Sequence, residues 1–143
     1  MDALTLDRLK QAMIDAGLEI YRVNGSEIRV AERVRMHLMD SGVSVTADSN
    51  AQITLTVRSQ RSDFPTAPAE ELFEKVRDTI GKTIEARGFR EVRAETRDIT
   101  DPVDESHVLD VWHELTFAKE APSLDGAIND LRWALNVPKC VDP

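Results

Sequence analysis

The sequence predicts an α+β fold in which an antiparallel sheet of four to six strands carries helices mainly on one face. Two observations indicate this class. Segments that alternate apolar and polar residues follow one another with only short turns between them, as antiparallel strands do. Three other segments repeat apolar residues at helical spacing and lie next to residues suited to helix caps. The expected order of elements is α-β-β-β(β)-α-β-β-α.

The first expected helix covers residues 5–16. Thr5 suits the N-cap, where a side-chain oxygen accepts a hydrogen bond from the helix backbone. Gly17 suits the left-handed position that often follows a helix. The apolar stripe of this helix consists of Leu6, Leu9, Met13 and Ala16.

A β-hairpin is expected next, because Asn-Gly at residues 24–25 lies between two segments rich in strand-forming residues. A two-residue turn at this point would place Arg22 opposite Glu27 and Tyr21 opposite Ile28. Both pairings are favourable across neighbouring strands.

The stretch that follows predicts a long strand from Glu27 to Met39, because its residues alternate with a period of two. The alternative for residues 31–40 is a helix from Ala31 to Asp40 that ends at Gly42. Apolar residues occupy the even positions Ile28, Val30, Val34, Met36 and Leu38, and polar residues the odd positions Arg29, Arg33, Arg35 and His37.

The middle of the chain predicts a turn at residues 40–42 and then alternating apolar residues over 43–57, interrupted at 48–50. This pattern fits one interrupted strand or two short ones. A polar connection that contains proline covers residues 58–68.

A second helix is expected over residues 68–87, with Pro68 in its first turn and Gly88 after its end. Two strands follow, at residues 89–99 and 108–119, joined by an acidic loop.

The last expected helix begins after a Ser123 cap and ends near Asn136. Residues 1–137 are therefore predicted to form a single domain, and residues 138–143 a loose C-terminal tail.

The composition limits the partners. The chain has 26 acidic and 18 basic residues and a formal charge of −8, which argues against nucleic acid, whose binding needs clustered cations. The single cysteine, Cys140, allows no intrachain disulfide and is typical of a reducing compartment. No signal peptide or membrane-spanning run is evident, so a cytoplasmic protein without a membrane partner is expected.

No catalytic residue, cofactor site or metal site is predicted, because no motif for a nucleophile, a nucleotide or a metal occurs in the sequence. His113 lies on the apolar side of the last strand, which favours a hydrogen-bonded core histidine over a base or ligand. The acidic residues between 98 and 118 favour a solvated hairpin tip over a calcium site.

The polar side of the sheet is a candidate interaction face, because tryptophan and arginine are enriched where proteins bind. The alternative is an ordinary solvent face on which Trp112 lies beneath long arginine side chains. The residues of the candidate face are Arg29, Arg33, Arg35, Arg93, Arg97 and Trp112.

A non-catalytic protein-interaction or assembly domain is therefore the expected function, with a protein partner or self-association into a homo-oligomer. The alternative is a small-molecule sensor with an apolar cavity between sheet and helices. The candidate cavity residues are Met36, Phe73, His113 and Phe117.

The order of elements, rather than any motif, resembles two groups of proteins. One is the small acidic chaperones of type III secretion, which pair as dimers. The other is the tail-terminator and tail-completion proteins of bacteriophages, which form rings. The resemblance implies a chaperone-like or phage-tail-type assembly component.

Overall fold

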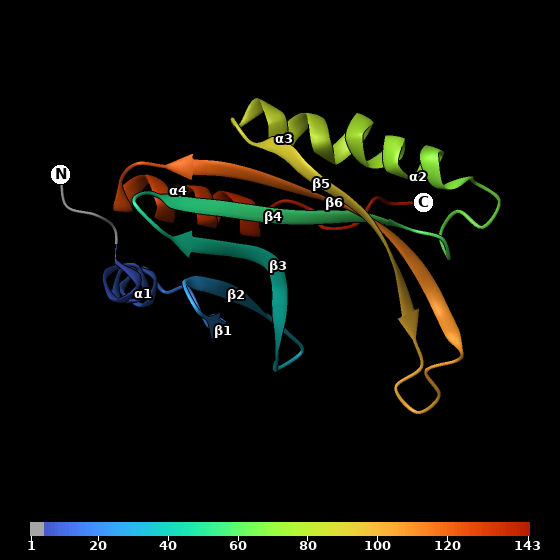
Figure 1. Ribbon diagram of the computed structural model, residues 1–143, viewed down its shortest axis with the longest axis horizontal. Coiled ribbons are helices and arrows are strands. Elements are labelled where there is room, and N and C mark those ends of the chain that lie inside the picture. The colour runs from blue at the N-terminus through green and yellow to red at the C-terminus, as the bar shows by residue number, and fades with distance from the viewer. Residues whose placement is uncertain (1–4) are drawn as a thin grey trace. The chain divides into compact units, whose positions relative to one another are not determined.

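The computed structural model describes residues 5–143, which form a six-stranded antiparallel sheet and helices, as predicted (Figure 1). The strands lie in the order β1-β2-β3-β4-β6-β5. The α+β class and the expected order of elements are confirmed. The elements are α1 (Leu6–Asp15), β1 (Ile20–Asn24), β2 (Glu27–Val34), β3 (His37–Ala47), β4 (Ala51–Gln60), α2 (Ala69–Val76), the π-helix η1 (Arg77–Gly81), α3 (Lys82–Ala86), β5 (Arg90–Thr100), β6 (Val108–Ala121) and α4 (Leu124–Leu135).

The described chain forms two compact units. Unit 1 comprises the described part of residues 1–55 together with residues 118–137, and unit 2 comprises residues 56–117 and 138–143. Strands β4 and β6 each contribute to both units. The single domain expected over residues 1–137 stays a prediction, and its first four residues lie outside the described part.

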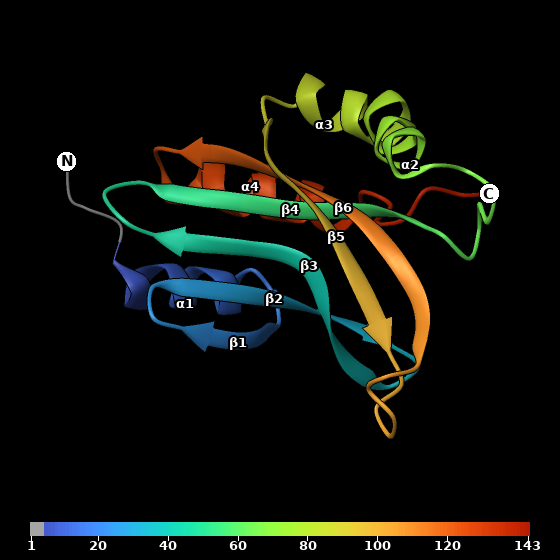
Figure 2. The same cartoon turned by 45° about the vertical axis from the view of Figure 1, so that its right-hand side comes forward.

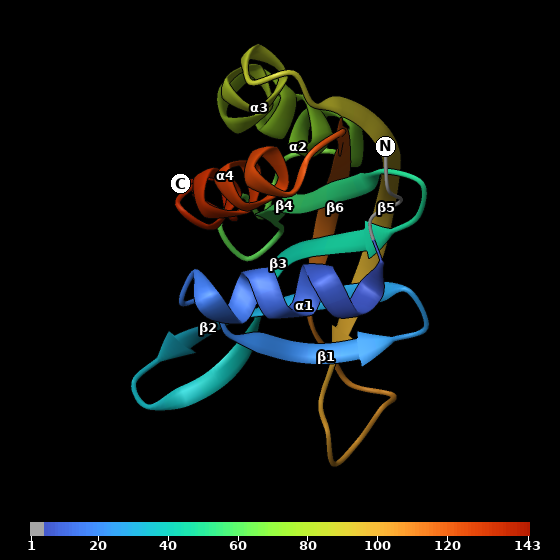
Figure 3. The same cartoon turned by 90° about the vertical axis from the view of Figure 1, so that its left-hand side faces the viewer.

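In unit 1, α1 and α4 cover one face of the strands, as Figure 3 shows. The caps predicted for both helices are confirmed. The Thr5 hydroxyl accepts a hydrogen bond from the Arg8 backbone N–H, and the Ser123 hydroxyl accepts one from Gly126. The core beneath these helices is formed by Leu9, Met13, Ile28, Val30, Val43, Val45, Ile53, Leu55, Ala127, Leu131 and Ala134, all fully buried.

In unit 2, the helical segment of residues 69–86 turns its buried residues Leu72, Val76 and Ile84 inward. It is continuous through η1, and Gly81 lies so close to the Phe117 ring that an added Cβ would approach it to 3.4 Å. The helix predicted over residues 68–87 is therefore present, with a π-helical turn that the sequence pattern did not indicate.

Within residues 138–143, expected as a loose tail, Cys140 forms a parallel bridge with Arg58 of β4. The Arg58 N–H donates to the Lys139 carbonyl, and the Val141 N–H donates to the Arg58 carbonyl, both at 2.9 Å. β3 pairs with β4 only as far as Leu55, so the backbone of Arg58 needs another partner. The C-terminal residues supply it.

The first hairpin is present, but its turn lies one residue later than predicted, which shifts the pairing by two residues. Asn24 pairs with Glu27, which places the turn at residues 25–26, and Arg22 lies opposite Arg29. Gly25 has a φ of 61° at the first turn position, where a type II′ turn takes glycine.

The long strand predicted from Glu27 to Met39 is wrong in one respect, because the chain folds back within it. Val34 pairs with His37 across a two-residue turn, in which Arg35 and Met36 have φ values of 51° and 75°. Positive φ at both positions is the geometry of a type I′ hairpin turn. The alternative helix over residues 31–40 is also excluded.

The turn predicted at residues 40–42 is instead an irregularity within β3. Its register with β2 shifts between the pairs Arg29–Ser44 and Ala31–Asp40. The Ser41 hydroxyl donates to the Val30 carbonyl at 2.7 Å. Between these two pairs β3 has more residues than β2, and the extra residues form a bulge, which bends a strand without ending it.

Candidate functional site

The tip of the β2–β3 hairpin in unit 1, residues 32–39, is exposed along its whole length, and we call it the arm (Figure 3). β1 pairs with β2 only up to Val30, and β3 pairs with β4 only from Val43. No strand of unit 1 therefore lies beside the arm on either side. Its exposed apolar side chains are Val34, Met36, Leu38 and Met39, of which Met36 is 93% exposed.

The three arginines predicted for the interaction face in this unit do not act as one cationic surface. Arg29 donates to the carboxylate of Asp40, and Arg33 is paired with Glu19 at 2.8 Å. Arg35 lies in the hairpin turn. The charges of two of the three are thus balanced by carboxylates, and the apolar residues are the distinctive feature of the arm.

The other three residues of the predicted face, Arg93, Arg97 and Trp112, lie in unit 2. The guanidinium groups of Arg58 and Arg97 lie 3.9 and 5.1 Å from the centre of the Trp112 ring. Arg97 also pairs with Glu114 at 3.2 Å. This is the alternative arrangement foreseen from the sequence, with the ring beneath arginine side chains, and it ties β5 to β6 and β4.

Asp110 is hydrogen-bonded to the Trp112 side chain of this cluster. It accepts hydrogen bonds from the Ser62 N–H and hydroxyl at 3.0 and 2.7 Å, and from the Trp112 indole at 3.2 Å. Burial alone would raise the pKa of Asp110, but these hydrogen bonds together with one from the Val111 N–H outweigh it and lower the pKa. Asp110 is therefore an ionised hydrogen-bond acceptor that fixes the local backbone.

His113 is 1% exposed and packs edge-on against the Phe73 ring, with 5.1 Å between the ring centres. Its Nδ1 lies 3.1 Å from the Thr96 hydroxyl. Burial lowers the pKa of His113, and the nearby Arg61 lowers it further, and both favour the neutral imidazole. Phe117 is fully buried on the same strand.

A serine on the neighbouring strand, β4, lies opposite this histidine. The Arg61–Val111 backbone bond and the contact between the Thr56 and Thr116 hydroxyls fix the pairing of β4 with β6, which places Ser59 opposite His113. The Ser59 hydroxyl and the His113 Nε2 are buried without a hydrogen-bond partner in the described chain. A nucleophile needs a hydrogen bond to its base, and this pair does not show one.

Of the residues predicted to line a cavity, Met36 is 93% exposed, whereas His113 and Phe117 are buried. Phe73, His113 and Phe117 belong to unit 2, whereas Met36 lies in the turn of the arm in unit 1. Met36 follows Val34 by two residues and so fitted the alternation of a single strand, but the turn exchanges the faces of even and odd positions, as the pairing of Val34 with His37 shows.

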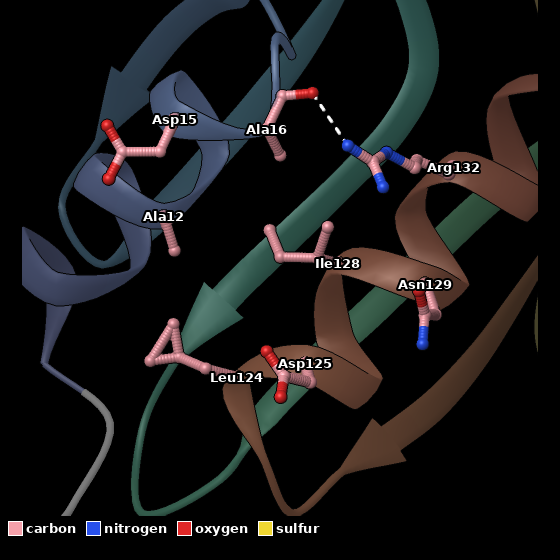
Figure 4. A pocket seen from close by; sticks show the side chains of 8 residues that line it. All are labelled: Ala12, Asp15, Ala16, Leu124, Asp125, Ile128, Asn129 and Arg132. Carbon is pink, nitrogen blue, oxygen red and sulfur yellow. Dashed lines mark hydrogen bonds between the residues drawn. The ribbon is translucent and has the colours of Figure 1, made fainter.

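An open pocket of about 530 Å³ lies between α1 and α4 in unit 1 (Figure 4). Leu124 and Ile128 give it an apolar floor, and Asp15 and Asp125 lie at its rim. Arg132 donates to the Ala16 carbonyl at 2.8 Å, which gives this carbonyl at the C-terminal end of α1 a hydrogen-bond partner. The guanidinium thus has a structural partner.

Sequence reasoning missed the outer edge of β5. This strand is the last of the sheet and pairs with β6 (Figure 2). Residues 90–98 are all exposed. The signal in the sequence is an uninterrupted strand of eleven residues in which acidic and basic residues alternate, REVRAETRDIT.

Within residues 5–143, no three histidine, cysteine, aspartate or glutamate side chains gather as metal ligands do. No helix in the same range is long and apolar enough to cross a membrane. Comparisons with protein-family models, curated proteins and solved structures gave no match for the chain.

Proposed function

We propose that the chain is a non-catalytic protein-interaction and assembly domain. The observation that carries this proposal is the arm of unit 1. Half of its eight residues are large apolar side chains, and these are 41% to 93% exposed. Val34 and Met39 lie on one face of the hairpin and Leu38 on the other, so the arm carries exposed apolar side chains on both faces. Exposed apolar surface of this kind marks sites where proteins bind.

The geometry of the arm supports the same proposal. A two-stranded hairpin beside which no described strand of unit 1 lies presents N–H and C=O groups on both edges for pairing with a partner. Such an edge accepts a strand from a partner, and alternate side chains then select that partner. The arm therefore offers backbone hydrogen bonds together with apolar contacts.

The buried polar groups support a non-catalytic role. His113 favours its neutral form, lies against Phe73 and Thr96, and has Arg61 as its charged neighbour rather than a carboxylate. A histidine that acts as a base is normally oriented by a third group such as a carboxylate. The sensor alternative is less favoured, because Met36 lies on the arm.

The test is the native mass of the full chain, measured by light scattering coupled to size exclusion over a wide range of concentration. We expect a concentration-dependent oligomer. A variant that carries Val34→Ser, Met36→Ser, Leu38→Ser and Met39→Ser should show a clearly lower mass, because the arm loses its apolar surface.

The matched control is Ile14→Ser, which removes an apolar side chain that is 55% exposed on α1 instead of on the arm. It should keep the wild-type mass. The proposal is contradicted if the arm variant, folded by circular dichroism, has the same mass as the wild type at every concentration.

A further inference from the structure

The outer edge of β5 is unusually regular for an exposed strand. Exposed edges are normally protected by proline, by a bulge, by short length or by charged side chains, since each of these hinders pairing with another chain. Residues 90–98, which we call the β5 strip, contain neither proline nor glycine and are exposed throughout. The strip therefore has the length and regularity to accept a further strand.

The charges of the β5 strip are balanced. It contains three arginines and three carboxylates, whereas the whole chain carries a formal charge of −8. Repulsion between two copies of the acidic chain is therefore not reinforced where two strips meet. The charged residues are Arg90, Glu91, Arg93, Glu95, Arg97 and Asp98.

The order of these charges is self-complementary. When two strips lie antiparallel about a two-fold axis at Ala94, each charged residue faces the opposite charge. The facing pairs, each formed twice, are Arg90 with Asp98, Glu91 with Arg97, and Arg93 with Glu95. Opposite charges directly across a strand pair stabilise it, and like charges destabilise it.

Neighbouring registers lose this match. A shift by one residue places Arg90 opposite Arg97 in one direction, and Glu91 opposite Asp98 in the other. A shift by two places Arg93 or Glu95 opposite its own copy. The register centred on Ala94 is thus selected over the four nearest alternatives, and its centre is a small side chain that meets its copy without a clash.

We propose that β5 pairs with β5 of a second copy of this chain, antiparallel and centred on Ala94, to form a two-fold dimer. The pairing goes beyond the proposed function, because it names a second copy as the partner and uses β5 instead of the arm. An interface of this kind is isologous, because the same surface serves both chains.

Arg93 and Glu95 are available for this pairing, whereas Glu91 and Arg97 already have partners within the chain. Arg93 and Glu95 are 60% and 55% exposed and are joined at 3.7 Å within the chain. An exposed ion pair of this kind contributes little to stability, so replacing it with an ion pair between two chains costs little free energy. Arg97 is held against Trp112 and Glu91 against Arg77, which keeps β5 extended.

The first experiment mixes two charge-reversed chains. In Arg93→Glu alone, and in Glu95→Arg alone, like charges face each other twice in the dimer, so each variant should dimerise at least about tenfold more weakly than the wild type. An equimolar mixture restores opposite charges at all four positions. We therefore expect a heterodimer in the mixture, measured by native mass spectrometry, and a homodimer in the chain with both substitutions.

The second experiment tests the register with a disulfide, in full chains that carry Cys140→Ser. Residues directly opposite in an antiparallel pair are close enough for a disulfide between chains. Ala94→Cys should therefore form a covalent dimer under mild oxidation. Val92→Cys is the matched control, because Val92 faces Thr96 rather than its own copy and should remain monomeric on a denaturing gel.

The outcomes separate this inference from the proposed function. If both single reversals keep the wild-type mass while the serine variant of the arm dissociates, the β5 pairing is overturned and the proposed function stands. If Ala94→Cys crosslinks no faster than Val92→Cys, the register is overturned. A wild-type chain that is monomeric at every concentration overturns both. Circular dichroism of each variant shows that it is folded.

Discussion

The arm and the β5 strip are both exposed stretches of antiparallel strand, and they differ in what their side chains can specify. The arm carries large apolar side chains and ends in a turn with two positive φ angles. The β5 strip carries alternating charges and no interruption. The apolar residues of the arm lie on both of its faces and so do not select one face for burial, whereas ordered charges select one alignment over its neighbours.

The two regions also differ in how they are held within their units. The β5 strip is fastened by Arg97 over Trp112, by Thr96 against His113, and by Glu91, which accepts two hydrogen bonds from Arg77. For the arm, the described side-chain contact is the exposed ion pair of Arg33 with Glu19. We therefore expect the arm to exchange its amide hydrogens faster than the β5 strip.

The largest expected effect is a loss of stability when the side-chain contacts that hold the β5 strip are removed. Trp112→Ala deletes the ring that Arg58 and Arg97 cover, and should lower the free energy of unfolding by about 2 kcal/mol. Hydrogen exchange should become faster in β5 and stay unchanged in the arm. Trp112→Phe, which keeps an aromatic ring, should lower the free energy of unfolding by less. Equal acceleration in both regions would contradict the difference drawn between them.

A smaller effect is expected from relief of strain in the arm. Arg35→Asn combined with Met36→Gly places residues that tolerate positive φ at both turn positions. The free energy of unfolding should rise by about 1 kcal/mol, measured by urea denaturation.

Gly25→Ala is the opposite control for this variant, since Gly25 has a positive φ and an added Cβ would meet no atom within 4 Å. It should be destabilised by strain alone. A destabilised Arg35→Asn, Met36→Gly chain would show that the Met36 side chain, rather than the turn, determines the stability of the arm.

The smallest of the three effects depends on pH and concerns unit 2. Burial, assisted by Arg61, lowers the pKa of His113 in the folded chain, so below about pH 6.5 the unfolded chain binds a proton that the folded chain does not. Stability should be complete above that pH and fall as the pH approaches the lower, folded value. His113→Gln should lose this part of the acid dependence in urea titrations. An unchanged pH profile in this variant would exclude His113 as its source.

The elements of the fold could be predicted from local patterns, and their register could not. Asn24-Gly25 and Gly25-Ser26 are both acceptable turn pairs, and the chain uses the second. In the arm, Arg35 and Met36 give no turn signal, and the even positions 34, 36 and 38 are all apolar on both sides of the turn. Only the pairing of Val34 with His37 reveals the reversal.

Some features of the candidate surfaces could be predicted from the sequence and others could not, because only some of them depend on a single strand. The position of His113 on the apolar side and of Trp112 beneath arginines follows from alternation along a single strand. The importance of β5 follows from strand order, because a charged strand matters for pairing only when it ends the sheet. Its charge pattern was visible in the sequence, but its place in the sheet depends on which distant strands pair.

The π-helical turn at Arg77–Gly81 has a consequence for how the length of the chain can change. A π-helical turn holds one residue more than an α-helical turn, so it is equivalent to an insertion already absorbed by the helix. Deletion of one residue there would let the segment close as a continuous α-helix, with α2 and α3 each keeping its buried face. A deletion within α2 or α3 would instead rotate the residues beyond it by about 100°. Among positions in this helix, Arg77–Gly81 is therefore where a single-codon deletion should be best tolerated.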